Sequence, residues 1–222
     1  MARLSRTSQM ILNDHLTYLS PQKLGRIESS LRRVLSNNVS GDILEFGVAL
    51  GGSAIVLANI AGSAHRRFYG FDVFEMIPAP TSEKDDEKSK QRYNLIASGK
   101  SEGIGGDLYY GYRNNLLEEV MQSFAKYKLP IDNQKRFLCK GLFENTLPKY
   151  DGNISFAHID CDWYDPVKFC LEEISKRLLP GGEIVLDDYH DYGGAHTAVD
   201  EFLKTKPNFQ FIDGPNVILQ VR

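Results

Sequence analysis

The chain alternates between nearly continuous apolar runs and amphipathic stretches. Strands read as continuously apolar when helices cover both faces of a parallel sheet. Five runs fit this description: DILEFGV (42–48), RFYGFDVF (67–74), RFLCKGLF (136–143), ISFAHID (154–160) and GEIVLDD (182–188). Helical patterns fall between or after them, at 52–62, 113–128, 165–182 and 195–206. The alternation predicts a doubly wound α/β fold.

Two short apolar runs at 209–213 and 216–222 are expected to form an antiparallel edge hairpin at the C-terminus. The prediction is therefore a mostly parallel, seven-stranded sheet with helices on both faces. In the helix at 165–182, we expect Asp165 as the N-cap, Pro166 at the first helical position and Gly181 just past the end. Leu178 then lies on the apolar face of that helix.

Two stretches do not fit the alternating core. Residues 5–38 are amphipathic and helical in pattern, so residues 1–40 are interpreted as an N-terminal helical cap before a domain at 41–222. Residues 76–112 are first charged and then rich in Gly and Tyr. A loop of this length is a lid, a binding loop or a solvated insertion. Tyr109, Tyr110 and Tyr112 favour the lid-like insertion.

Composition excludes several classes of function. The formal net charge of -3 over 222 residues gives no electrostatic reason to expect nucleic acid. No apolar run has membrane-spanning length and the N-terminus lacks the apolar core of a signal peptide, so we expect a cytoplasmic protein without a membrane partner. The three cysteines show no CxxC spacing, which favours a reducing compartment over disulfides or zinc.

The segment LEFGVALGGSA (44–54) places glycines between the first strand and the following helix. Open α/β sheets bind nucleotide-like ligands at this position. The dinucleotide fingerprint GxGxxG does not fit, because residue 49 is Ala. An acid-x-Gly-x-x-x-Gly pattern does fit, with Glu45 as the acid. A tight turn without a ligand is the alternative.

Asp72 ends the second predicted strand, where an acid can bind ribose hydroxyls. A helix cap is the alternative for this residue. Together, Glu45 and Asp72 around a glycine turn favour an adenosine ligand without phosphates, of which S-adenosylmethionine is the common one.

Four aspartates follow two neighbouring strands. Asp160 and Asp162 point the same way because they are two residues apart, and Asp187 and Asp188 end the next strand. Two like charges ~4 Å apart cost about 4 kcal/mol at an effective dielectric of ~20. Such a cluster needs a cation, shared protons or separation, and its oxygen ligands favour Mg²⁺, Ca²⁺ or Mn²⁺. Solvated helix caps are the alternative, but two acid pairs at two strand ends favour a metal.

The remaining candidates are weaker. His190 lies beside the aspartates and could support a ligand or contact the substrate, whereas His158 inside a strand is more typical of a hydrogen-bonded core residue. Trp163 and Tyr164 are expected to shape the wall of the pocket.

These motifs together resemble the class I S-adenosylmethionine-dependent methyltransferases, and among them the macrocin O-methyltransferase family. The resemblance rests on GDILEFGVALGGSA (41–54), GLFENTLP (141–148), HIDCDWYDP (158–166) and LLPGGEIVLDDYHDYGGAHTAVDEF (178–202). The two acidic segments are the most specific, since generic methyltransferases lack the double-acid pair.

The resemblance implies roles for individual residues. Mg²⁺ ligands would be Asp160, Asp187 and Asp188, and the general base would be Asp162. The implied contacts of S-adenosylmethionine are Glu45, Gly47, Gly51, Ser53 and Asp72, with Leu142 and Phe143 near the adenine.

The implied activity is Mg²⁺-dependent O-methylation of a small molecule that carries a hydroxyl. The resemblance favours a sugar of a glycosylated natural product or polysaccharide, and a homo-oligomer. Ala49 and Leu50 depart from the aromatic and basic residues that the family often has there, and residues 76–112 do not align, so the acceptor is left open. A nicotinamide oxidoreductase, a non-catalytic cofactor-fold module and a metal-dependent hydrolase are the alternatives.

Overall fold

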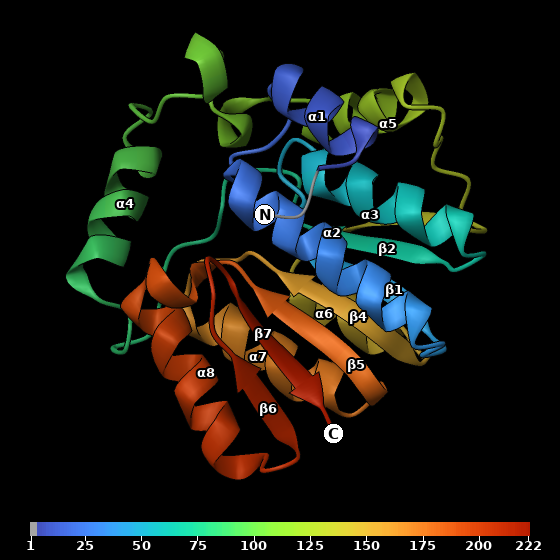
Figure 1. Ribbon diagram of the computed structural model, residues 1–222. Coiled ribbons are helices and arrows are strands. Elements are labelled where there is room, and N and C mark those ends of the chain that lie inside the picture. Colours follow the sequence, from blue (N-terminus) through green and yellow to red (C-terminus); the bar gives the residue numbers. More distant parts are fainter. Residues whose placement is uncertain (1–3) are drawn as a thin grey trace.

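A computed structural model of the chain describes residues 4–222 and shows a single seven-stranded sheet in the order β3-β2-β1-β4-β5-β7-β6 (Figure 1). The first five strands run parallel and β7 is antiparallel to both β5 and β6. The doubly wound fold and the C-terminal antiparallel hairpin are thereby confirmed.

The strands are β1 (Asp42–Phe46), β2 (Phe68–Asp72), β3 (Arg136–Lys140), β4 (Ile154–Ile159), β5 (Leu178–Leu186), β6 (Phe209–Ile212) and β7 (Val217–Val221). The α-helices are α1 (Arg6–Asn13), α2 (Pro21–Ser36), α3 (Gly52–Ser63), α4 (Glu87–Ala97), α5 (Leu116–Lys126), α6 (Phe143–Thr146), α7 (Tyr164–Ser175) and α8 (Gly193–Thr205). Short 3₁₀ turns are η1 (Ile104–Gly106), η2 (Tyr110–Tyr112), η3 (Leu147–Lys149) and η4 (Asp188–His190).

Two apolar cores lie on opposite faces of the sheet. One joins the sheet to helices α1, α2, α3 and α5, and the other joins it to α7 and α8. Alternate residues of β1 serve the two cores, with Ile43 in the first and Leu44 in the second. Because side chains alternate across a strand, a strand covered twice must be apolar on both faces. This explains the unbroken apolar runs of the sequence.

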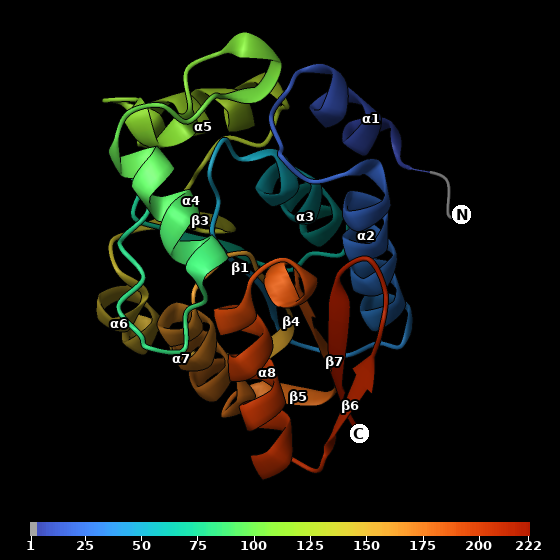
Figure 2. The same cartoon turned by 90° about the vertical axis from the view of Figure 1, so that its left-hand side faces the viewer.

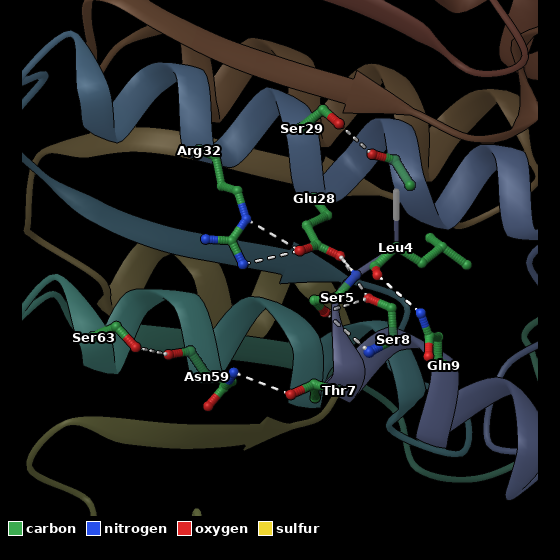
Figure 3. Close-up of polar contacts among 11 residues, drawn as sticks. Leu4, Ser5, Thr7, Ser8, Gln9, Glu28, Ser29, Arg32, Asn59 and Ser63 are labelled. Carbon is green, nitrogen blue, oxygen red and sulfur yellow. Dashed lines mark hydrogen bonds and ion pairs between the residues drawn. The ribbon is translucent and has the colours of Figure 1, made fainter. Parts of the chain in front are cut away.

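The two N-terminal helices pack onto the sheet face beside α3 and are fastened to one another by a buried carboxylate (Figure 3). Glu28 Oε2 accepts hydrogen bonds from Ser5 N at 3.2 Å and Ser8 Oγ at 2.7 Å, and Glu28 Oε1 accepts from Arg32 Nη2 at 2.9 Å. The hydrogen bonds from Ser5 and Ser8 to Glu28 join α1 to α2. A buried carboxylate is stable only where its oxygens are hydrogen-bonded, so these contacts hold the two helices together. No helix of residues 4–222 is long and apolar enough to cross a bilayer.

The insertion at 76–112 is folded and carries α4, η1 and η2; α4 lies across the end of the sheet in Figure 2. Two consecutive aspartates dock it onto two helix N-termini. Asp85 Oδ1 accepts from the backbone N–H of Tyr164, the first residue of α7, at 2.8 Å. Asp86 Oδ2 accepts from the N–H of Gly193, the first residue of α8, at 2.9 Å. Carboxylates are favoured at such positions because the first amides of a helix lack partners.

The α7 region differs from the sequence prediction at both ends: the helix begins at Tyr164, so Pro166 is its third residue, and Gly181 lies within β5. Trp163, not Asp165, occupies the N-cap, and Asp85 supplies the capping carboxylate from the insertion. The helix also ends at Ser175, so Leu178 belongs to β5, where it pairs with Ile154. Tertiary pairing with β4 overrides the helical spacing of Leu178, because the ladder hydrogen bonds and the edge of the core are both available there.

The docking of the insertion can be tested at Gly194, since a Cβ there would overlap Asp85 Oδ1 and lie 2.9 Å from Tyr164 N. Gly194→Ala is expected to lower the free energy of unfolding by about 1–3 kcal/mol, as overpacking does. It should also speed protease cleavage within 76–112. Urea unfolding and limited proteolysis measure the two effects. Gly62→Ala is the matched control, because no atom lies within 4 Å of its added Cβ. Equal stability of the two variants would contradict the docking role.

Candidate active site

The glycine turn after β1 has the backbone that only glycine adopts easily. Gly47 has φ of 91° and Gly51 has φ of 89°. An added Cβ at Gly47 would overlap the carbonyl oxygen of Asp160, so the turn lies directly against the end of β4. Ala49 is also left-handed, with φ of 47°. These positions cost free energy for other residues, and the turn persists because its surroundings hold it.

Asp72 holds this turn in place. Its Oδ2 accepts from Val48 N at 2.7 Å and Ala49 N at 3.0 Å, and its Oδ1 accepts from Phe74 N at 2.6 Å. Burial raises the pKa of Asp72 even though these amides favour the charged form. The residue also lines the larger of the two cavities described below, so it both shapes the turn and faces that cavity.

Glu45 lies on β1, as the sequence predicts, with its carboxylate directed at a neighbouring strand. It is fully buried on β1, lines neither cavity, and its Oε1 lies 2.9 Å from Nδ1 of His158 on β4. Its second oxygen has no hydrogen-bond partner. The sheet register places Glu45 beside His158 and neither cavity extends to it, so direct cofactor contact stays a prediction.

The aspartates converge as the strand ends predict. Because β4 and β5 are parallel neighbours with Ile159 opposite Leu186, the residues that follow them lie side by side. One oxygen each of Asp160, Asp187 and Asp188 lies within 4.8 Å of the others. Such a spacing suits one small cation held by three carboxylates.

The charges of this cluster are only partly balanced. Burial and the neighbouring carboxylates raise the pKa values of Asp160 and Asp188 well above the usual range. Asp187 Oδ1 is buried and makes no hydrogen bond, although its Oδ2 accepts from Lys23 Nζ at 2.8 Å. A buried carboxylate oxygen without a partner is costly. The three residues therefore fit a divalent cation of the hard, oxygen-preferring class.

Asp162 adjoins the cluster in an unusual conformation. Its φ is 60°, and its N–H donates to Asp188 Oδ2 at 2.9 Å. Burial raises the pKa of Asp162 to about 7; Arg92 opposes this shift and Asp187 adds to it. A carboxyl group with a pKa near neutrality is suited to proton transfer.

The acids form part of the wall of a cavity of about 850 Å³, large enough for two ligands of modest size. The insertion supplies much of the opposite wall, including Arg92 on α4 and the pair Tyr109 and Tyr110. Tyr18 packs edge-on against both tyrosines, at centroid distances of 6.2 and 5.9 Å, and so joins the N-terminal segment to the insertion. Leu142 and Phe143 also line this cavity, and their contact with an adenine stays a prediction.

A second cavity of about 30 Å³ lies beside the first at the start of α3 and is lined in part by Gly47, Gly52 and Ser53. Gly51 is the N-cap of α3 and supplies no side-chain hydrogen bond, so the first amides of this 12-residue helix are open to a ligand. Such amides bind carboxylates and other anions. The turn therefore fits the carboxylate of a cofactor.

The histidines stay outside the main cavity. His190 Nε2 lies 3.0 Å from Asp213 Oδ1 near the surface, and neither it nor His158 lines a cavity. Trp163 does line the wall, and its Nε1 donates to the carbonyl of Pro78 at 2.9 Å. Sequence reasoning missed Lys23 and Arg92, because nothing in their local sequence links them to the acids.

Comparison of the chain with known proteins identifies the family to which it belongs. The family model described as Macrocin-O-methyltransferase (TylF) matches residues 13–215. A tetracenomycin-C rhamnosyl 4'-O-methyltransferase of Streptomyces olivaceus is 30% identical over 200 residues, covering 83% of this chain and 70% of that protein. The mycinamicin III 3''-O-methyltransferase of Micromonospora griseorubida is 27% identical over 201 residues, covering 85% of this chain and 74% of that protein.

A solved structure agrees with these relatives. The O-methyltransferase NovP superposes with a TM-score of 0.75 at 26% identity, over 93% of this chain and 82% of that one. These matches favour none of the alternatives of oxidoreductase, hydrolase or non-catalytic module. The chain belongs to the macrocin O-methyltransferase family and is an S-adenosylmethionine-dependent O-methyltransferase.

Proposed function

We propose that this enzyme methylates a sugar hydroxyl of a glycosylated small molecule or polysaccharide in a reaction that depends on Mg²⁺. The observation that carries the proposal is the group of three carboxylates at the wall of the large cavity, with Asp162 beside it. The relatives act, by their names, on a rhamnosyl group of tetracenomycin C and on mycinamicin III. Those substrates support the choice of acceptor class.

Asp160, Asp187 and Asp188 are the proposed metal ligands. When bound, a divalent ion would lower the pKa of an acceptor hydroxyl and orient it. The unpartnered Asp187 Oδ1 and the raised pKa values of the other two carboxyl groups support this role, because both features are relieved by a cation.

Asp162 is the proposed general base. Its carboxylate would accept the proton of the acceptor hydroxyl as that oxygen bonds to the methyl carbon, and bound S-adenosylmethionine would supply the methyl group, keeping the electron pair of the broken carbon–sulfur bond. The left-handed turn at Asp162, held by its N–H bond to Asp188, keeps the base beside the ligands. Much of the rate would come from this positioning.

The proposed cofactor contacts are Gly47, Gly51 and Ser53 at the glycine turn, Asp72 at the end of β2, and Leu142 and Phe143 on the cavity wall. Glu45 would act indirectly, since it supports β1 from within the sheet. The open amides at the start of α3 suit the carboxylate of the cofactor.

The proposed metal dependence is tested by turnover. Purified enzyme is incubated with labelled S-adenosylmethionine and a panel of deoxysugar glycosides, and methylated products are identified by mass. We expect a glycoside to be methylated, with the rate falling at least about tenfold in chelator and returning when Mg²⁺ is restored. Full activity in chelator would leave the three acids with a structural role only.

The role of Asp162 is tested with Asp162→Asn, which keeps the size of the side chain and tolerates the left-handed backbone. Turnover is expected to fall roughly 10²- to 10⁴-fold because the amide cannot accept the proton. The Kd for S-adenosylhomocysteine, measured by calorimetry, should stay within about twofold. Exposed Asp151→Asn is the matched control. Turnover that equals the control would remove Asp162 from the mechanism.

The same substitution tests the electrostatics without a substrate. In chelator the folded pKa of Asp162, about 7, exceeds its ordinary value of 3.8, so the folded state binds more protons between these pH values. Stability from this group is therefore lost as pH rises from about 4 to 7.

Asp162→Asn cannot lose stability in this way. Between about pH 4 and 7, the free energy of unfolding of the wild type should therefore fall by about 1–3 kcal/mol relative to that of the variant. Solvent in the cavity screens the charge and keeps the effect within this range. Urea unfolding at stepped pH measures the difference. Parallel pH profiles of the two proteins would show that Asp162 is not perturbed.

A further inference from the structure

A lysine from the first turn of α2 lies against the carboxylate cluster. Lys23 Nζ donates to Asp187 Oδ2 at 2.8 Å, to the carbonyl oxygen of Asp187 at 3.0 Å and to Asp191 Oδ2 at 2.7 Å. Its side chain is 18% exposed and that of Asp187 is 9% exposed. The pair is therefore well removed from bulk water, where exposed ion pairs contribute little.

The contact with Lys23 leaves the two carboxylate oxygens of Asp187 in different environments. Oδ2 is held by the ammonium group, and Oδ1 is buried with no hydrogen-bond partner. Because Lys23 also holds the carbonyl of the same residue, both the backbone and the side chain of Asp187 are fixed. One carboxylate oxygen is thus left for a ligand in a set orientation.

Lys23 is itself anchored. Its backbone N–H donates to Ser20 Oγ at 3.2 Å, which is the N-cap bond of α2, and its carbonyl accepts from Asn216 Nδ2 at 3.3 Å. The stem of the side chain therefore starts from a fixed point between α2 and the loop before β7. A rigid starting point reduces the side-chain entropy that holding an ion pair costs.

Among residues 4–222, no other lysine or arginine forms an ion pair with any of Asp160, Asp162, Asp187 and Asp188. Arg92 and Lys88 line the same cavity, but Arg92 bonds the hydroxyl of Ser101 and Lys88 the backbone carbonyl of Asp191. Lys23 is therefore the cation in direct contact with the cluster among the described residues.

We propose that Lys23 is a positioning residue that acts as the built-in counter-cation of the carboxylate cluster. It offsets the charge of Asp187 and keeps the cluster assembled while no metal ion is bound. This inference rests on the proposed metal site. Once the ion is bound, its double charge neutralises the same carboxylates, so the contribution of Lys23 to stability shrinks.

The test compares thermal unfolding of the wild type, Lys23→Met and Lys23→Arg in chelator and in saturating Mg²⁺. The Met variant keeps the apolar stem and loses the charge, and the Arg variant keeps the charge. Lys126→Met is the matched control, because Lys126 forms a single ion pair with Asp14 and is 67% exposed. Calorimetry of Mg²⁺ binding to the same proteins provides a second readout that does not need turnover.

In chelator, Lys23→Met should melt roughly 5 °C below the wild type, and Lys126→Met within about 1 °C of it. Mg²⁺ should close at least about half of the Lys23→Met gap, and Lys23→Arg should melt close to the wild type in both conditions. A Lys23→Met gap as small as that of the control would overturn the inference. So would a gap that stays constant or widens in Mg²⁺.

The wild type separates this failure from that of the proposed function. If Mg²⁺ neither binds the wild type in calorimetry nor raises its melting temperature, the metal-dependent reaction fails and the inference about Lys23 fails with it. If Mg²⁺ binds and stabilises the wild type while the Lys23→Met gap persists, only the inference about Lys23 is overturned.

Discussion

Repulsion between carboxylates at the ends of β4 and β5 is the constraint on which the rest of the site depends. Parallel neighbouring strands bring Asp160 next to Asp187 and Asp188, and the sheet cannot relax to separate them. Two like charges at such distances oppose folding by several kcal/mol unless protons or cations offset them. Burial and this crowding together raise the pKa values of Asp160 and Asp162, and the ammonium group of Lys23 offsets part of the charge.

The surrounding structure is able to hold this unfavourable group because it is firmly built elsewhere. Both faces of the sheet are covered by apolar cores, and the strands that carry the acids lie at its centre. Irregular backbone is confined to the end of the sheet, where Gly47, Ala49 and Asp162 have positive φ. Local conformations that cost free energy persist where the surroundings fix them, and they commonly mark functional sites.

The parts of the fold and site that follow from local pattern could be predicted from the sequence. The apolar runs predicted the parallel strands. Acids directly after two of these strands predicted one cluster, because the carboxyl ends of parallel strands lie at the same edge of a sheet. Glu45 shows where this reasoning stops. Its place in the motif is local, but its contact with His158 depends on the register of β1 against β4.

Contacts between residues far apart in the chain could likewise not be predicted from the sequence. Lys23 is 164 residues from Asp187 in the chain, and a lysine in an amphipathic helix is ordinarily a solvated one. The capping of α7 by Asp85 could not be predicted for the same reason. Asp165 was the cap expected from the local sequence, but the N-terminus of the helix is capped by Asp85 of the insertion. Tertiary packing determines which side chains are buried and which groups they contact, and the local sequence predicts neither reliably.

The docking of the insertion ties one wall of the large cavity to the segments that carry the acids. α7 begins two residues after Asp162 and α8 begins two residues after Asp191, and Asp85 and Asp86 bind the first amides of these helices. A shift of the insertion would therefore have to break contacts with the segments that carry the acids. Because methyl transfer depends on alignment to within a fraction of an ångström, this short mechanical path is a physical reason for a folded insertion rather than a loose loop. Under the proposed function, the residues of the insertion that face the acceptor could differ between relatives while the position of the reacting hydroxyl relative to the acids is preserved.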